Sequence, residues 1–167
     1  KLVMGEHQQI GLVAAASVAD YDTNRIRKHE FTRPEKEDDR VRQIDALNTQ
    51  TGPVFLTYRH NKVIDDIVSE ISKVTPEYDL TADDGVQHTI WVINDKQIIN
   101  TITTTFDAMD CLYIADGHHR SAAASRIAAQ RKNSNGNTDA ACNYFLSVIF
   151  PDNQMNILDY NQIGRAH

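Results

Sequence analysis

The segment Asp116-Gly117-His118-His119-Arg120 combines residue types that bind anions. It lies between an apolar strand predicted over 112–115 and an Ala-rich helix predicted over 121–132. Backbone N–H groups at a helix N-terminus are unpaired, and the helix dipole favours negative charge there. Gly117 lets the backbone approach a phosphate closely, and Arg120 offers a planar fork to its oxygens. The sequence therefore predicts a phosphate site at this turn.

The remaining side chains of the segment add protonation chemistry. His118 and His119 are donors whose charge depends on pH, and Asp116 is a candidate ligand for Mg²⁺. In the alternative interpretation, Asp116 caps the helix and the histidines are polar surface residues. Neighbouring residues diverge in a helix or a strand, so the adjacent histidines do not favour a zinc or di-iron site.

A second polar cluster spans residues 28–40. Glu30 precedes a predicted helix, where its carboxylate could act as a general base on a substrate hydroxyl. Arg33, Lys36 and Arg40 recur at helical spacing and would line one side of a triphosphate site. The alternative is a solvated, charge-rich helix start with no ligand.

The elements that must position these clusters follow from periodicity and turn residues. A strand is predicted over 10–18, a turn over 20–24 and a returning extended segment over 25–30. Together they predict a β-hairpin. Thr32 and Glu35 fit a capping box at the start of the next helix. Other strands are predicted over 54–58, 86–93, 112–115, 144–150 and 157–160, helices over 63–71, 98–106 and 121–132, and a polar loop over 133–138. Without strict strand–helix alternation, the fold class is α+β.

Composition excludes several classes of protein. The chain has 167 residues, 41% hydrophobic and 24% charged, with 7 Gly and 4 Pro, which is typical of a folded domain. The formal net charge of −6 disfavours non-specific nucleic-acid binding, and no apolar run approaches the length of a membrane span. No P-loop, dinucleotide-binding or nucleophile-elbow motif occurs. The isolated Cys111 and Cys142 favour a reducing cytoplasm.

Several motifs together resemble one bacterial family, known as domain of unknown function one-thousand-and-fifteen. The segment Tyr113–Arg120 looks like the D-G-H-H-R signature of the ParB/sulfiredoxin-like superfamily. The wider pattern consists of Ser17–Asp22, Lys28-His29-Glu30, Thr32-Arg33, Lys36–Arg40, Pro53–Leu56 and His88–Trp91. The resemblance runs from about residue 11 to 160. Members of the family are longer at both ends, so we expect residues 1–167 to be a single domain from a longer chain.

The resemblance implies a fold, the ParB/sulfiredoxin-like mixed sheet with packed helices. It also implies an enzymatic activity. Free serine kinases of this superfamily share a His-Glu pair and a downstream D-G-H-H-R box, and they phosphorylate free L-serine with a nucleotide. Carried over, Glu30 would be the base, and residues 116–120 would bind phosphate and magnesium. Sulfiredoxins have a catalytic Cys where this chain has His118, which disfavours sulfinic-acid repair.

The sequence as a whole predicts a cytoplasmic, nucleotide-dependent phosphotransferase that acts on a small hydroxyl compound, with L-serine as one candidate. Mg²⁺ is the expected cofactor, and ATP or ADP the phosphate donor. The predicted catalytic residues are Glu30, Asp116 and His119, and the predicted phosphate-binding residues are Gly117, His118, Arg120, Arg33, Lys36 and Arg40. The rivals are an NTP-binding or NTP-hydrolysing switch, a ParB-like nuclease and a catalytically silent module. The kinase interpretation requires Glu30 and Arg120 to share one pocket.

Overall fold

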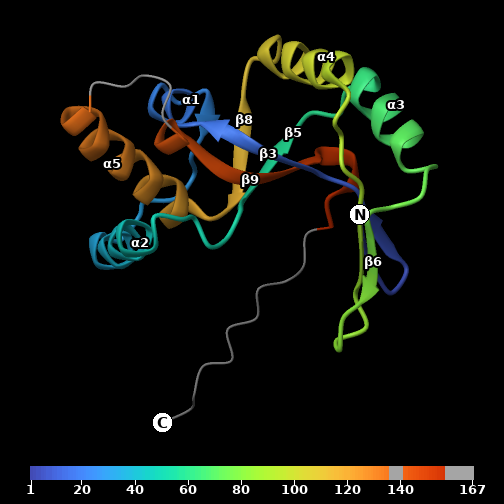
Figure 1. The fold of residues 1–167 in the computed structure, drawn as a ribbon, viewed down its shortest axis with the longest axis horizontal. Helices are drawn as coiled ribbons and strands as arrows, with labels where there is room; N and C mark the ends of the chain where they lie inside the picture. Colours follow the sequence, from blue (N-terminus) through green and yellow to red (C-terminus); the bar gives the residue numbers. More distant parts are fainter. Residues whose placement is uncertain (136–140, 157–167) are drawn as a thin grey trace.

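The computed structural model describes residues 1–135 and 141–156, and within them the fold is mixed α+β with two sheets (Figure 1). The strands are β1 (Leu2–Met4), β2 (His7–Gln9), β3 (Leu12–Ser17), β4 (Ile26–Arg27), β5 (Val54–Tyr58), β6 (Tyr78–Thr81), β7 (Gln87–Ile90), β8 (Leu112–Asp116) and β9 (Tyr144–Pro151). The helices are α1 (Val18–Asp22), α2 (Pro34–Leu47), α3 (Lys62–Ile71), α4 (Lys96–Asp107) and α5 (His118–Asn135), with short 3₁₀ turns at Ala141–Asn143 and Asp152–Gln154. The strand predicted over 157–160 and part of the loop predicted over 133–138 lie outside the described residues.

The larger sheet has the strand order β3-β9-β5-β8-β4. β4 runs parallel to β8, and β5 runs parallel to β9, whereas β3 with β9 and β5 with β8 are antiparallel. The register between β5 and β8 shifts at Phe55/Leu56, where Phe55 lies opposite Asp116. A β-bulge of this kind redirects side chains at the end of a strand.

The predicted hairpin between 10–18 and 25–30 is wrong, because β3 and β4 form opposite edges of the sheet. The residues between them do not form a simple turn. Val18–Asp22 folds into α1, with the Ser17 hydroxyl accepting from the Asp20 N–H at its start. Val18 and Tyr21 are buried in the core. The connection from β3 to β4 therefore packs a short helix against the core instead of turning back beside β3.

The smaller sheet has the order β2-β1-β7-β6 and is antiparallel throughout. The predicted strand over 86–93 is shorter in the structure, where β7 covers Gln87–Ile90 and pairs with β6. The sequence missed β1, β2 and β6 because they are only three or four residues long and β6 is exposed along its whole length, so their apolar alternation is weak.

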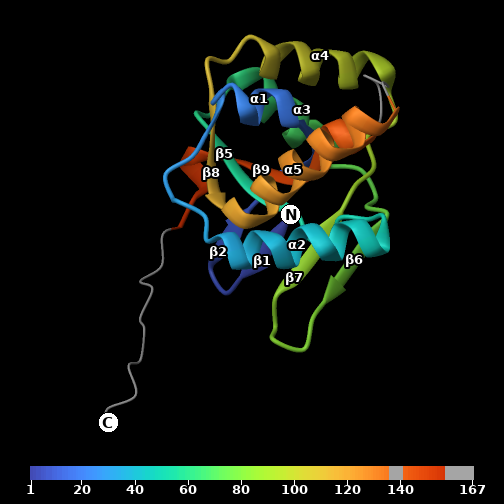
Figure 2. The same ribbon diagram turned by 90° about the vertical axis from the view of Figure 1, so that its left-hand side faces the viewer.

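The main core packs against one face of the larger sheet, because the buried Val54, Leu56 and Tyr58 alternate along β5 and Leu56 pairs with the buried Ile114. Leu56 and Ile114 on its central strands are 0% and 1% exposed and pack with Ile64 of α3, Phe145 of β9 and alanines of α5. Figures 1 and 2 show α1, α2 and α5 gathered on one side of the sheet, with α4 running across the top. The predicted helices over 63–71 and 98–106 are confirmed as α3 and α4.

α2 packs along α5 through Val41, Ala123 and Ile127. Arg126 of α5 also pairs with Glu37 at 3.3 Å and with Asp38 at 2.7 Å, both in the first two turns of α2. These contacts fix the start of α2 against α5, which places the basic side chains of α2 beside the N-terminal half of α5.

The capping box predicted from Thr32 and Glu35 is wrong. Arg33 occupies the N-cap position without a side-chain cap, and Pro34 is the first helical residue. The Thr32 hydroxyl instead hydrogen-bonds the Glu37 carboxylate. Glu37 also binds Arg126 on α5, so a tertiary contact takes the place of the local cap.

We predict that Leu56→Ala lowers the free energy of unfolding by about 2–5 kcal/mol, because it leaves a cavity in the middle of the core. Leu47→Ala is the matched control, since Leu47 is 56% exposed at the end of α2. That change should cost within about 0.5 kcal/mol. Urea denaturation followed by circular dichroism measures both values. Equal losses for the two variants would contradict the placement of the core.

Candidate functional site

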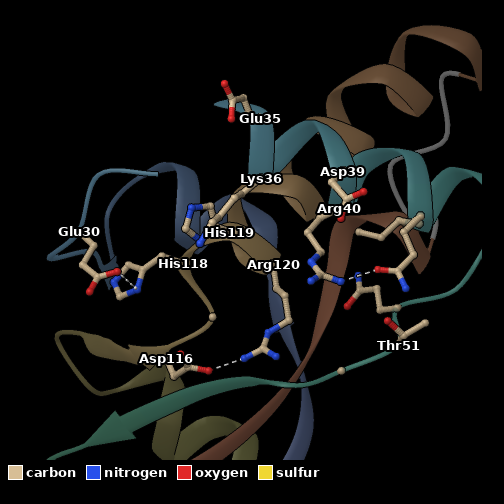
Figure 3. Close-up of a pocket in the computed structure, with 15 residues that line it drawn as sticks. Glu30, Glu35, Lys36, Asp39, Arg40, Thr51, Asp116, His118, His119 and Arg120 are labelled. Carbon is tan, nitrogen blue, oxygen red and sulfur yellow. Dashed lines mark hydrogen bonds and ion pairs between the residues drawn. The ribbon is translucent and has the colours of Figure 1, made fainter. Parts of the chain in front are cut away.

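The two polar clusters meet because of the parallel pairing of β4 and β8. Ile26 pairs with Leu112 and Arg27 with Tyr113, so both chains leave the sheet in the same direction. The segment after β4 therefore carries Glu30 to the same edge at which β8 leads into α5. Figure 3 shows Glu30 and His118 facing each other across this edge.

α5 begins earlier than the sequence predicted, at His118 rather than at residue 121. Gly117 precedes it with a φ of +99°, a conformation that favours glycine. His118, His119 and Arg120 therefore form the first turn of an 18-residue helix with no acidic residue in that turn. The unpaired N–H groups of such a turn favour an anion.

Arg120 folds back over Gly117. Its Nη2 donates to Asp116 Oδ2 at 2.5 Å, and its Nε is buried without a hydrogen-bond partner among the described residues. A Cβ at Gly117 would lie 3.0 Å from Arg120 Nε and Nη2 and 3.3 Å from the Cα of Val54. Glycine therefore serves two needs here, the backbone conformation and the close approach of the guanidinium.

A pocket of about 680 Å³ lies between the N-terminus of α5, the first turns of α2 and the loop before β5 (Figure 3). The described residues of its wall include four carboxylates, three cationic side chains and two imidazoles. The lining residues are Glu30, Glu35, Lys36, Asp39, Arg40, Gln43, Ile44, Gln50, Thr51, Gly52, Asp116, Gly117, His118, His119 and Arg120. Glu30 and Arg120 thus border the same pocket, which is the spatial condition that the kinase interpretation required.

His118 lies at the Glu30 end of the pocket. It is 5% exposed, its Nδ1 is 3.5 Å from Glu30 Oε2, and its ring meets that of His29 edge to face at 4.4 Å between centroids. Burial, with a smaller contribution from His29, lowers the pKa of His118 below its usual value, although Glu30 and Asp116 oppose the shift. His118 is therefore neutral at pH 7, where an imidazole can accept a proton or a metal ion.

Of the three basic residues predicted around α2, two line the pocket and one does not. Lys36 and Arg40 of α2 line the pocket, and Arg40 donates to Gln43 at 2.7 Å. Arg33 is not among the lining residues, because it precedes α2 rather than continuing its basic face. Its backbone N–H instead donates to His119 Nε2 at 3.1 Å, which links the two segments.

Sequence reasoning missed several residues of the site. His29 is one of them, and its position next to Glu30, which puts an imidazole and a carboxylate in one segment, is the signal that indicates a shared site. Gln43, Ile44, Gln50 and the loop at 51–52 carry no signal of their own. They reach the pocket only because α2 packs on α5 and because β5 lies beside β8.

The chain belongs to the family described as protein of unknown function (DUF1015), whose family model matches residues 1–164. This confirms the resemblance to the family of unknown function. No curated protein and no solved structure matches the chain. Among the described helices, none is long and apolar enough to cross a membrane.

We predict that Gly117→Ala destabilises the protein more than Gly85→Ala. Both glycines have a positive φ, which costs a residue with a Cβ about 1–2 kcal/mol. A Cβ at Gly85 meets nothing within 4 Å, whereas one at Gly117 meets Arg120 and the backbone of Val54. The difference between the two free energies of unfolding, measured by urea denaturation, reports the crowding at Gly117. No difference would show that the guanidinium does not need this close approach.

Proposed function

We propose that the chain is a nucleotide-dependent phosphotransferase that acts on a small hydroxyl compound. The observation that carries the proposal is that the Glu30 carboxylate and the Arg120 guanidinium border one polar pocket together with the N-terminus of α5. These are the groups that phosphoryl transfer needs, namely a base for the acceptor and preorganised positive charge for the phosphoryl group.

In this proposal, the phosphates of the nucleotide bind at the α5 end of the pocket. The first-turn N–H groups and Arg120 would contact the transferred phosphoryl group, and Lys36 and Arg40 would face the remaining phosphates. A volume of about 680 Å³ falls within the range typical of ligand pockets. The acidic residues of the wall would repel the phosphates in the absence of a cation, which is consistent with a need for magnesium.

In this proposal, Glu30 acts on the acceptor. Its side chain is 61% exposed, so a hydroxyl compound can reach it from solvent. Glu30 would take the hydroxyl proton as the acceptor oxygen bonds to phosphorus and the bond to the nucleotide leaving group breaks. His119, held by the Arg33 N–H, would help to stabilise the charge on the transferred group.

The finer assignments are part of the same proposal. Asp116 remains the proposed magnesium ligand, although its carboxylate is paired with Arg120 in this structure. ATP and ADP are both candidate donors. The resemblance to free serine kinases makes L-serine the first acceptor to test. On the same resemblance, we propose that the fold is ParB/sulfiredoxin-like.

The exposure of Glu30 also favours a second function. A carboxylate open to solvent can orient water instead of a hydroxyl compound, which would make the chain a nucleotide-hydrolysing module. The two functions share the nucleotide site and differ in their product. A phosphorylated small molecule indicates transfer, whereas inorganic phosphate alone indicates hydrolysis.

We predict that Glu30→Gln lowers turnover by about 10²–10⁴-fold, because the amide cannot accept the acceptor proton. Nucleotide affinity should change little, since Glu30 lies away from the cationic end of the pocket. Calorimetry with ATP, ADP and CTP in the presence of Mg²⁺ measures binding. Mass spectrometry of reactions with L-serine and other small alcohols measures transfer.

Glu77→Gln is the matched control, because Glu77 is an exposed carboxylate outside the pocket. It should keep full turnover. If Glu30→Gln retains full turnover, Glu30 is not the base. If no nucleotide binds to the unmodified chain, the proposed function is wrong.

A further inference from the structure

We propose that His29, Glu30 and His118 form a binding site for one divalent first-row transition-metal ion, such as Zn²⁺. One ligand atom from each residue lies within 4.8 Å of the other two. The three side chains come from two distant segments, so sequence spacing did not indicate the set. The adjacent His118 and His119 do not favour a zinc site in the sequence, and His119 is not a member of this group.

The separation of His118 and Glu30 fits two ligands of one ion better than it fits a hydrogen bond. His118 Nδ1 and Glu30 Oε2 are 3.5 Å apart, beyond the usual N–H···O range of about 2.7–3.2 Å. Two ligands at about 2.1 Å from a tetrahedral ion are about 3.4 Å apart. Small side-chain movements would bring the third ligand, His29, to a similar separation.

The burial of His118 is the independent observation that points to a ligand. The His118 side chain is only 5% exposed, and its Nε2 has no hydrogen-bond partner among the described residues. Its Nδ1 has only the long contact with Glu30. A metal ion on Nδ1 would partner the nitrogen that faces Glu30 at a distance too long for a hydrogen bond, whereas Nε2, on the other side of the ring, would stay unpaired.

The ligand types select the class of metal. Two imidazoles and one carboxylate suit Zn²⁺ and its first-row neighbours, whereas Mg²⁺ and Ca²⁺ prefer oxygen ligands alone. This site is therefore distinct from the magnesium site proposed at Asp116. Three protein ligands also leave one position for water or a substrate oxygen.

The ion would occupy the Glu30 end of the pocket, opposite the side chain of Arg40 (Figure 3). A hydroxyl group or water bound there would lose its proton more readily, because the metal lowers its pKa. In the metal-bound protein, Glu30 would hold the ion through one carboxylate oxygen and take the acceptor proton on the other, while the ion lowers the pKa of the acceptor. The metal site itself does not depend on phosphotransfer.

The test is calorimetric titration of the chelator-treated chain with Zn²⁺ in the absence of nucleotide. We expect one ion per chain. His29→Ala and Glu30→Gln should each weaken binding by at least about tenfold, since even outer-shell partners of metal ligands contribute that much. Both side chains are exposed, so the variants should fold, which circular dichroism checks.

His60→Ala is the matched control. His60 Nδ1 also lies 3.5 Å from a carboxylate, that of Asp152, but the pair belongs to no group of three possible ligands among the described residues. This variant should bind Zn²⁺ as the unmodified chain does. Titration with Co²⁺ should give visible absorption bands without thiolate charge transfer, which separates this site from the free thiols Cys111 and Cys142.

Three results would overturn the metal site. They are no Zn²⁺ binding, binding that neither His29→Ala nor Glu30→Gln weakens, and a thiolate charge-transfer band with Co²⁺. Nucleotide binding with Mg²⁺ is measured separately on the chelator-treated chain. The metal site and the phosphotransferase proposal can therefore fail independently.

Discussion

The parallel pairing of β4 with β8 is the interaction on which the candidate site depends. Only two residue pairs define it, Ile26 with Leu112 and Arg27 with Tyr113. Parallel neighbours end at the same edge of a sheet, so the pairing sends residues 28–33 toward the start of α5. Arg25 supports it from the other end, donating to Asp20 and to the carbonyls of Phe106, Asp107 and Met109 at the end of α4. The short edge strand β4 is therefore held by its pairing with β8 and, just before the strand begins, by the hydrogen bonds of Arg25.

The pocket combines opposite charges with little mutual neutralisation. Arg120 pairs with the Asp116 carboxylate, and Arg40 donates to the neutral amide of Gln43. Within the described pocket wall, Lys36 has no carboxylate partner, and Glu30 contacts only His118. Such a wall suits a ligand that carries both negative and cationic parts, such as a nucleotide with its metal ion. The cationic groups come from α2 and α5, whereas Glu30 and His29 come from the segment after β4. The two ends of the pocket therefore differ in chemistry because they belong to different elements.

Membership of a family of unknown function leaves the chemistry to be argued from the site itself. The fold alone would not decide between transfer, hydrolysis and binding, since similar folds support different reactions. The most informative single residue is His118, because it touches both proposals. It begins the helix that would bind phosphate, and it is the buried member of the possible metal site. Its buried imidazole has one nitrogen unpaired among the described residues and the other 3.5 Å from Glu30, which is a free-energy cost that the folded chain carries at this position.

Local patterns of residues were sufficient to predict the elements with strong periodicity and the chemistry of the two polar clusters. The apolar repeats of α3 and α4, the strands β5, β8 and β9, and the α+β class were predictable, because each depends on a local pattern. Tertiary structure decided the rest. The edge positions of β3 and β4, the loss of the Thr32 cap to Glu37 and Arg126, and the pairing of His29 and Glu30 with His118 all depend on contacts between distant segments. A sequence pattern records which face of an element is apolar, but it does not record which strand lies beside it, and that neighbour determines where the polar groups meet.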